Sequence, residues 1–351
     1  MKTLDSLIQL FNDHGYLAYG VGGCVRDYLL NREIHDYDLA TDATPDQMLV
    51  LFDGYLTTTM GKQYGTIGVY YQDQWFECTT FRKDIDSLDY RHPQAVSFNA
   101  SLKEDVLRRD FTINALAYYQ GDIIDYVNGQ EDLQNKLIRS VGSPSLRFQE
   151  DALRLLRALR FASELGFRIE QSTLEAIDKH LDLLTHISKE RITQELKRLV
   201  MGPYVNDGYF YLLERILNTK VNPIGNEKYF VSRLLRLAPD IDYKSLKLSK
   251  THIKQIELIR EYKDRNINLS KLVNNHGYEN VLVLADYKNE SVENITVKDL
   301  KITGHHLIDL NIEEKKRASL LNKLLEDVIA GKVNNDLSSL LKRLDELDDF
   351  R

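Results

Sequence analysis

The sequence is poor in cysteine and lacks both long apolar runs and an excess of positive charge. Its 351 residues include only Cys24 and Cys78, too few for a disulfide framework or a cysteine-ligated metal site. Met1–Leu10 has polar residues in every turn, which is typical of neither a signal peptide nor a membrane span. We therefore expect a protein of the reducing cytoplasm with no membrane partner.

The charge balance excludes a generally basic surface. There are 46 Lys and Arg against 53 Asp and Glu, a net charge of -7, so the chain does not coat nucleic acid through its overall charge, although a locally basic cleft is compatible with that total. Internal repeats, low-complexity segments and long linkers are also missing. The length favours two or three domains and is ample for a sizeable core.

The first 137 residues mix strand and helix patterns. Ser101–Glu104 is a capping box, and we expect the helical run that it opens to include Arg108–Ala115. Residues 82–97 are charged and without pattern, which predicts a flexible loop. A helix is expected over 3–13, and β-rich runs lie at 17–21, 35–40, 66–71, 75–81 and 123–127. These elements predict a compact α+β head.

After Ile138 the pattern becomes helical and stays so. Leucines alternate with arginines over 153–161, and 188–200 is a further amphipathic helix that Gly202-Pro203 ends. Beyond residue 205 no strand pattern is evident. The sequence predicts a small mixed head followed by a long all-helical stalk.

The strongest chemical signal is Gly20–Asp27 followed by His35–Ala40. Glycines let the backbone approach a phosphate closely, and the helix that follows points N–H groups at it. Asp36 and Asp38 sit two apart on a predicted strand, so both carboxylates project from one face. Two hard oxygen ligands beside a phosphate-binding turn favour Mg²⁺ held between the protein and a triphosphate. The alternative, solvated acids at a surface corner, ranks second because the two features occur together.

Further polar residues extend this candidate site. Glu77 on a neighbouring predicted strand is a candidate third carboxylate, although the sequence favours an exposed strand acid. Arg26 and Arg109 are candidate triphosphate clamps, since a guanidinium offers a fork of donors that matches phosphate oxygens. Asp110 and Asn114 are four apart, hence on one face of the expected helix, and could contact a ribose or fix Arg109. A surface ion pair is the alternative for such a helical Arg–Asp pair.

Asp151, Arg154, Arg157 and Arg160 recur every three residues, which predicts a slanting row on one helix. Such rows usually mean a solvated face with ion pairs. The alternative is base recognition: an Asp carboxylate only accepts hydrogen bonds and an Arg guanidinium only donates them. Cytosine and adenine present an amino donor beside a ring-nitrogen acceptor, which Asp151 and Arg154 can satisfy. Uracil and guanine would leave buried polar groups unpaired, a strong basis for rejection. Arg157 and Arg160 could hold phosphates or orient that first pair.

Together these motifs resemble class II tRNA nucleotidyltransferases of the DNA polymerase β superfamily. The resemblance is close from about Tyr19 to Val200 and general beyond. The motifs that carry it are Gly22-Gly23-x-Val25-Arg26-Asp27 with Asp36-x-Asp38, then Arg108–Ala115, then Asp125 through Gly129 with Asp132-Leu133, then Glu150-Asp151-x-x-Arg154 with Arg157 and Arg160, and finally Glu190-Arg191-Ile192 with Glu195-Leu196.

The resemblance implies a function and a fold. Such enzymes add CCA to the 3′ end of tRNA from CTP and ATP without a nucleic-acid template, and pyrophosphate is released. The family fold is a seahorse-like polymerase-β-type head, neck, body and tail, which would correspond here to 1–137, 138–200, 201–270 and 271–351. A monomer or a homodimer is expected.

The resemblance also implies roles for single residues. Asp36 and Asp38 become the metal ligands, with Mg²⁺ as the cofactor. Gly23, Arg26 and Arg109 become contacts to the nucleotide phosphates and sugar, with Asp110 and Asn114 in the same nucleotide site. Asp151 and Arg154 become the protein template that pairs with the incoming base, with Arg157 and Arg160 beside them.

Three alternatives stay open at this stage. The family includes CC-adding, A-adding and poly(A)-adding members. CC-adding members lack a flexible loop, and the segment 82–97 resembles that loop in Asp89, Arg91 and Pro93. This resemblance favours full CCA addition. A non-catalytic RNA-binding protein would be expected to lose a metal carboxylate, yet both are present. A nucleotidyltransferase for a small molecule would need neither the helical stalk nor Asp151 and Arg154.

Overall fold

A computed structural model describes residues 1–85, 95–97, 100–310 and 312–347. The chain divides into two compact units, Met1–Leu212 and Leu213–Arg351, called here the N-terminal and C-terminal units. The predicted division into four parts is finer than this and stays a prediction. Of the loop expected at 82–97, the positions Asp89, Arg91 and Pro93 lie outside the described residues.

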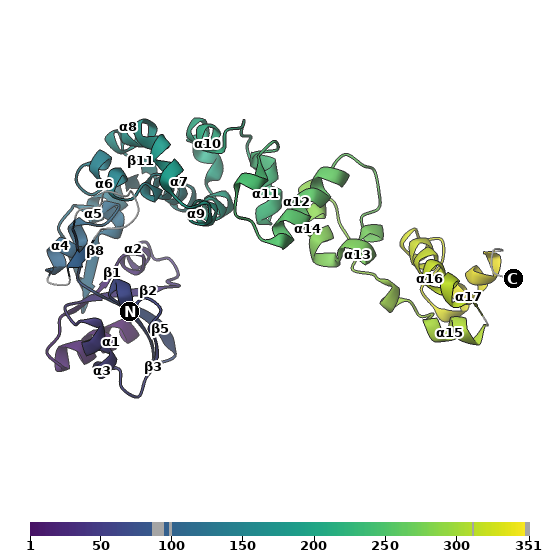
Figure 1. The fold of residues 1–351 in the computed structure, drawn as a ribbon, viewed down its shortest axis with the longest axis horizontal. Coiled ribbons are helices and arrows are strands. Elements are labelled where there is room, and N and C mark those ends of the chain that lie inside the picture. Colours follow the sequence, from purple (N-terminus) through teal and green to yellow (C-terminus); the bar gives the residue numbers. More distant parts are fainter. Residues whose placement is uncertain (86–94, 98–99, 311, 348–351) are drawn as a thin grey trace. The chain divides into compact units, whose positions relative to one another are not determined.

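A mixed seven-stranded sheet organises the N-terminal unit, in the order β3-β4-β5-β2-β1-β8-β9 (Figure 1). β2 and β5 run parallel, and the other neighbours are antiparallel. The strands are β1 (Ala18–Val21), β2 (Tyr37–Thr41), β3 (Leu56–Thr58), β4 (Thr66–Tyr71), β5 (Gln74–Thr80), β8 (Leu116–Tyr119) and β9 (Asp122–Asp125). The predicted α+β class is confirmed, but the short strands β3 and β8 were not predicted.

Helices cover one face of this sheet, and on the other face Leu102 packs against Val21, Ala40 and Ala117. α1 (Lys2–Asp13) buries Leu4, Leu7, Ile8 and Phe11, as its helical periodicity predicts. α3 (Pro45–Leu51) begins with a capping box at Thr44 and packs against β4. Phe11 meets Phe52, the C-cap residue of α3, edge to face at 5.5 Å between centroids. Alternation along β5 buries Phe76 and Cys78 and turns the intervening residues toward the other face.

The turn from β1 into α2 (Gly23–Leu29) is built on glycine. Gly22 has φ +75° and ψ −136°, a backbone conformation that residues with a Cβ rarely adopt. β1 pairs with β2 so that Val21 lies opposite Asp38. The glycine turn is therefore brought directly beside the acidic strand.

Between residues 82 and 140 the structure departs from the predicted elements. Lys83–Ile85 (β6) and Ala95–Ser97 (β7) pair as a hairpin within the segment expected to be a loop. α4 (Leu102–Leu107) has the predicted capping box but ends before Arg108, so the helix expected through Ala115 is wrong. Phe111 instead pairs with Ser140 in a β-bridge, and a 3₁₀ turn, η2, covers Thr112–Asn114. That bridge joins the segment after α4 to the residues that precede α6.

Helices complete the N-terminal unit. α7 packs along α9, and Gly166 ends α7 in the left-handed conformation that glycine adopts readily. The expectation of helices alone after Ile138 is wrong at one point, because Arg168–Ile169 (β11) pairs with Leu137–Ile138 (β10). The helices are α5 (Gly129–Gln134), α6 (Pro144–Glu150), α7 (Leu153–Leu165), α8 (Gln171–His180) and α9 (Lys189–Met201).

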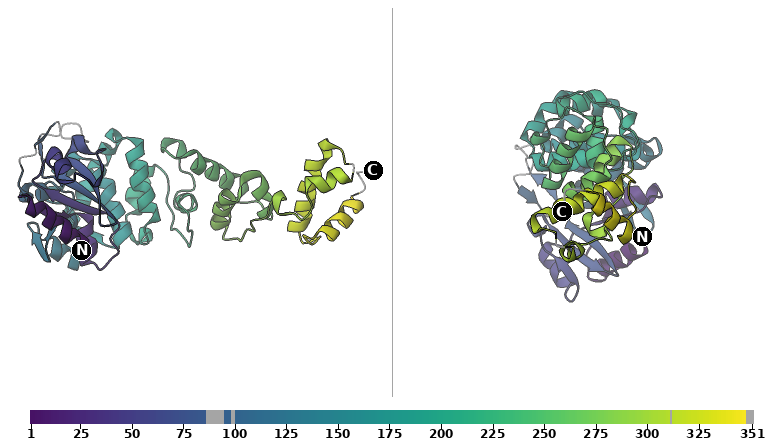
Figure 2. Two further views of the ribbon diagram at one scale, coloured as in Figure 1. Left: turned by 90° about the horizontal axis from the view of Figure 1, so that it is seen from below. Right: turned by 90° about the vertical axis from the view of Figure 1, so that its right-hand side faces the viewer.

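In the described part of the C-terminal unit every regular element is a helix, as predicted (Figure 2). α14 packs against α11, α12 and α13, and the last helices share a separate apolar cluster that extends from Leu300 to Leu347. α10 (Phe210–Leu217) crosses the division between the units. The others are α11 (Phe230–Leu237), α12 (Lys250–Tyr262), α13 (Ser270–His276), α14 (Tyr278–Lys288), α15 (Gly304–Asp309), α16 (Glu314–Ile329) and α17 (Leu337–Glu346). Among the described residues, no helix combines the length and the apolar character needed to cross a bilayer.

The close approach of α7 and the end of α9 depends on Gly202. A Cβ on Gly202 would lie 2.0 Å from Ser163 Oγ and 2.6 Å from Ser163 O. We expect Gly202→Ala to lower the free energy of unfolding of the N-terminal unit by about 1–3 kcal/mol, because the backbone of α7 must move to admit the methyl group. Calorimetric unfolding measures this. Gln194→Ala on the exposed side of α9 is the control, expected within about 0.5 kcal/mol of the unaltered protein.

Candidate functional site

Every site residue predicted from the sequence lines one cleft in the N-terminal unit. The cleft has a volume of about 610 Å³, a size usual for sites that bind small molecules. The sheet and α2 form one side, and the segment after α4 together with α7 and α9 forms the other. The predicted residues in its lining are Gly23, Arg26, Asp36, Asp38, Arg109, Asp110, Asn114, Asp151, Arg154, Arg157 and Arg160.

The acidic side of the cleft is built on β2 and β5. Asp38 lies on β2 directly opposite Glu77 of β5, whereas Asp36 precedes the strand, which begins at Tyr37. Burial raises the pKa of Asp38 to about 6; Arg109 opposes this rise, and the charges of Glu77 and Asp36 add to it. Glu77 is exposed, as the sequence favoured, and also lines the cleft beside the candidate metal ligand.

Arg109 lies between the acids and the glycine turn. Its Nη1 atom and the Oδ2 atom of Asp38 would lie 3.1 and 3.3 Å from a Cβ added to Gly22. Its Nη2 atom donates to Asp105 at 3.0 Å, while its buried Nε atom has no hydrogen-bond partner. A buried guanidinium N–H without a partner is unusual and is suited to an anionic oxygen entering the cleft.

The sequence did not single out Asp105, which positions this arginine. The Asp105 side chain is 2% exposed and pairs with Arg108 at 2.7 Å and with Arg109 at 3.0 Å. Burial works to raise the pKa of Asp105, but the two guanidinium groups outweigh it and the pKa falls below its ordinary value. The i,i+3 and i,i+4 spacing of one acid before two arginines was the available signal.

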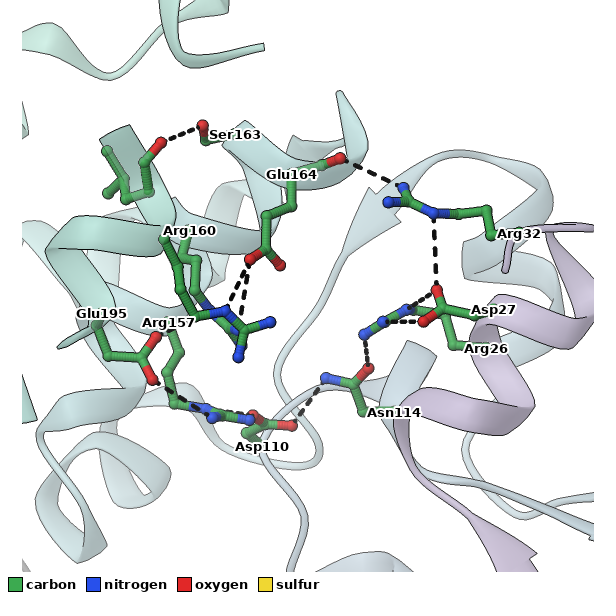
Figure 3. A network of polar contacts seen from close by, with 12 residues as sticks. Arg26, Asp27, Arg32, Asp110, Asn114, Arg157, Arg160, Ser163, Glu164 and Glu195 are labelled. Atoms are coloured by element: carbon green, nitrogen blue, oxygen red, sulfur yellow. Dashed lines mark hydrogen bonds and ion pairs between the residues drawn. The ribbon is translucent and has the colours of Figure 1, made fainter. Parts of the chain in front are cut away.

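A chain of polar contacts links α2 to α7 through Asp110 (Figure 3). Arg26 pairs with Asp27 at 2.8 Å and donates to Asn114 Oδ1 at 2.8 Å. Asn114 Nδ2 donates to Asp110 Oδ1 at 3.2 Å, so these two side chains meet although they share no helix. Arg157 donates to Asp110 Oδ2 from Nε at 2.8 Å and from Nη2 at 2.6 Å. The chain thus joins the glycine-turn helix to the helix that carries the arginine row.

The contacts of Asp110 decide its charge. Burial works to raise the pKa of this carboxyl, but Arg157 outweighs it through its charge and hydrogen bonds, and the pKa falls to about 2. Asp110 is therefore ionised at neutral pH while it is 9% exposed. Its role in the structure is to hold the Arg157 guanidinium in place.

Glu195 of α9 continues the network on the far side of Arg157 (Figure 3). Its carboxylate lies 2.8 Å from Arg160 Nε and 3.7 Å from Arg157 Nη1. Arg160 is 2% exposed and also lies 3.6 Å from Glu164. Burial, with Arg157 nearby, lowers the pKa of Arg160 to about 10, so it stays charged at neutral pH. Arg160 is thus enclosed by acids within the helical wall.

Asp151 and Arg154 have separate partners. Asp151 precedes α7 with extended backbone angles, so the predicted row of four on one helix is wrong and only the three arginines share it. Arg191 of α9 donates to Asp151 Oδ2 at 3.0 Å. Arg154 pairs with Glu150 at 2.8 Å and donates to the carbonyl of Arg108 at 3.0 Å. Arg191 therefore orients Asp151, and Glu150 orients Arg154. From the sequence, both neighbours were noted only as members of a motif.

We expect Arg157→Met to lower the free energy of unfolding at pH 7 by roughly 3–5 kcal/mol, because it leaves the buried Asp110 carboxylate unpaired. The contribution of the pair is present above the ordinary Asp pKa of about 3.9. It is lost as the pH falls toward the folded-state pKa of about 2. The difference from the unaltered protein should therefore shrink on acidification, which denaturant unfolding at several pH values measures.

The double variant Asp110→Asn with Arg157→Met is the control for this prediction. It removes the buried charge together with its partner, so most of the lost stability should return. A double variant no more stable than Arg157→Met alone would contradict the assignment to the ion pair.

Two family models match parts of the chain. One, described as the poly A polymerase head domain, matches residues 18–139. The other, described as a probable RNA and SrmB-binding site of polymerase A, matches residues 166–224. Both matches begin in the N-terminal unit, which contains the cleft.

Curated relatives cover different shares of the chain. A CCA-adding enzyme of Bacillus pumilus is 50% identical over 56% of this chain and 49% of its own length. One of Geobacillus sp. strain WCH70 is 48% identical over 59% of this chain and 51% of its own. The match therefore spans about half the length of these two. The CCA-adding enzyme of Staphylococcus saprophyticus is 35% identical over 97% of both chains.

Solved structures extend the similarity to the fold. A crystal structure of the Bacillus stearothermophilus CCA-adding enzyme in complex with CTP is 29% identical, with a TM-score of 0.78 over 98% of both chains. A Thermotoga maritima CCA-adding enzyme complexed with tRNA, 20% identical with a TM-score of 0.67, shares the fold. With a relative 35% identical along nearly its whole length, this chain belongs to the CCA-adding enzymes, a family of tRNA nucleotidyltransferases.

Proposed function

We propose that this protein adds C, C and A to the 3′ end of tRNA from CTP and ATP without a nucleic-acid template. In each step the terminal ribose hydroxyl forms a bond to the α-phosphorus, and the bond to pyrophosphate breaks. One observation carries the proposal: a single cleft gathers the acids beside β2, the glycine turn, Arg109 and the pair Asp151 and Arg154. Membership of the family supports it.

Asp36 and Asp38 are the proposed ligands of Mg²⁺. Their donors are hard oxygens, and burial, with the charges of Glu77 and Asp36, raises the pKa of Asp38 although Arg109 lowers it, so a bound cation would stabilise this carboxylate. Within the described ranges no three His, Cys, Asp or Glu side chains are grouped to hold a metal ion by themselves. That agrees with an ion bound by two carboxylates and completed by phosphate oxygens and water. When bound, the ion neutralises phosphate charge and favours ionisation of the attacking hydroxyl.

Gly23, Arg26 and Arg109 are the proposed contacts to the triphosphate and sugar. Arg26 uses three donors on Asp27 and Asn114, which leaves two of its five N–H groups for a ligand. Arg109 offers its unpartnered Nε atom. In this proposal Asp110 and Asn114 hold Arg26 and Arg157 at a fixed spacing and line the nucleotide site.

Asp151 and Arg154 are proposed to recognise the base. The Asp151 carboxylate accepts from the amino group of cytosine or adenine, and Arg154 donates to the neighbouring ring nitrogen. Arg191 and Glu150 orient these two side chains before a base arrives. Arg157 and Arg160 are proposed to support them from within the wall, since Arg160 is enclosed by Glu195 and Glu164. Uracil or guanine would leave polar groups of the site unpaired.

CC-adding, A-adding and poly(A)-adding activities are the second candidates, because members of this family differ in product. The sequence feature that separates them lies at 82–97, largely outside the described residues. The product therefore decides between them.

The free, buried thiols of Cys24 and Cys78 fit the cytoplasmic location proposed from the cysteine content.

We expect the purified protein, given Mg²⁺, CTP, ATP and tRNA lacking its CCA end, to extend the RNA by CCA and stop. Sequencing the 3′ end of the product measures this, and absence of C incorporation would refute the function.

Asp38→Ala should remove transfer while tRNA binding stays within about twofold, because the metal serves the reaction more than RNA docking. Asp53→Ala, which removes an exposed acid, is the control and should leave both unchanged.

We expect Asp151→Ala to relax base selection more than it slows transfer. Selectivity for CTP over UTP should fall roughly 10²-fold or more, because the site no longer opposes the uracil oxygen with a carboxylate acceptor. Arg191→Met should shift selectivity in the same direction by less. The ratio of kcat/KM for the two nucleotides measures both effects, with Asp182→Ala, at an exposed position, as control. Unchanged selectivity in Asp151→Ala would assign this residue a structural role.

A further inference from the structure

The face of the sheet that carries Glu77 also carries a row of exposed apolar side chains. Leu56 of β3 pairs with Tyr70 of β4, which pairs with Trp75 of β5. Their exposed fractions are 64%, 37% and 47%. The Tyr70 and Trp75 rings lie 5.5 Å apart between centroids. We call these three residues the apolar row.

The apolar row lies beside Glu77 and Asp38 on the same face of the sheet. Trp75 and Glu77 are two residues apart on β5, so they share a face of the sheet at about 7 Å along the strand. Glu77 lies opposite Asp38 on β2. At Gly68 of β4 an added Cβ would meet the methyl group of Thr58 first and would lie 3.8 Å from Cζ3 of Trp75. Thr58 of β3 therefore covers this glycine, and the indole lies beside it.

A structural explanation accounts for only part of this arrangement. An aromatic ring beside a strand glycine is a known device for stabilising a sheet, and single exposed apolar residues are ordinary. It does not explain why two further apolar side chains continue the row to β3, the edge strand of the sheet. Exposed apolar edges favour unwanted pairing. Such a row is typical of a surface that a partner covers.

The topology of the cleft indicates which partner that is. α2 contacts β1, β2 and β8, and the proposed base-reading residues lie on and beside α7. The incoming nucleotide is therefore bound on the β1 side of Asp38. The RNA hydroxyl must reach Asp38 as well, and the sheet continues on the other side of Asp38 through β5, β4 and β3. The apolar row lies on that side.

We propose that the unpaired 3′ end of the tRNA lies across β5 and β4 and that one of its bases stacks on Trp75, an inference that rests on the proposed function. Stacking on an aromatic ring accepts any base. This tolerance suits a primer whose last base changes after each addition. The neighbouring Asp36 and Glu77 carboxylates disfavour a phosphate at this point, so the contact is made by a base.

Trp75 is the only tryptophan in the chain, so its fluorescence reports on this position alone. We expect tRNA lacking CCA, added without nucleotide, to quench Trp75 emission and to protect it from acrylamide. The same tRNA trimmed to a blunt acceptor stem should bind without quenching, because it offers no unpaired base. Equal quenching by the two RNAs, or none by either at saturation, would overturn the proposal whether or not CCA is added.

Kinetics of Trp75 variants provide a second test. Trp75→Ala should raise KM for tRNA about 5- to 140-fold, the range expected for loss of one base–aromatic stack, with KM for CTP unchanged. Trp75→Leu, which keeps an apolar side chain without a ring, should behave like Trp75→Ala, whereas Trp75→Phe should recover most of the affinity. A rise in KM shared by Trp75→Phe, or absent from Trp75→Leu, would contradict a stacking role.

Tyr55→Ala is the matched control for these variants. Tyr55 is 42% exposed and packs against Phe52 and Tyr71, on the face covered by α3. Its loss should leave KM for tRNA within about twofold, since surface changes away from a binding contact have little effect. Sedimentation of Trp75→Ala tests the other occupant, a second copy of this chain. A loss of self-association in that variant with unchanged KM for tRNA would overturn the proposal.

Discussion

The ion pair between Asp110 and Arg157 is the contact on which the geometry of the cleft depends. Its partners are 47 residues apart in the chain and belong to the segment after α4 and to α7. The same carboxylate accepts from Asn114, which in turn accepts from Arg26 of α2. One buried carboxylate therefore fixes the spacing between α2 and α7 on the two sides of the cleft. Without Arg157 that charge would be unpaired, so the arrangement forms as a unit.

Two aspartates of the same cleft differ in pKa because their surroundings differ. Burial opposes ionisation of both, but Asp110 faces a guanidinium and its pKa falls to about 2. Asp38 faces Glu77 and Asp36 as well as Arg109, and its pKa rises to about 6. Asp110 is already neutralised by the protein, which suits a structural role. Asp38 has the guanidinium of Arg109 nearby but also the charges of Glu77 and Asp36, which agrees with the proposed role of binding a cation.

Sequence patterns located the site better than they described its backbone. The acid spacing, the glycine turn and the arginine row led to residues that all line one cleft. Helical propensity failed at Arg108–Ala115, where Phe111 is drawn into a bridge with Ser140, because long-range pairing overrides a local preference. Asp110 and Asn114 still meet, through a 3₁₀ turn that spacing alone does not distinguish from an α-helix.

The sequence by itself determined the periodic helices, the positions of the chemical groups and the order of the motifs, since these depend on spacing along one chain. Only the tertiary structure decided the partners that lie far apart in the chain: Arg191 for Asp151, Glu195 for Arg160, and Asp110 for Arg157. It also decided that Leu56, Tyr70 and Trp75 form a row. Strand register and helix crossings bring together residues far apart in sequence, and the cost of burying an unpaired charge then selects which of them pair.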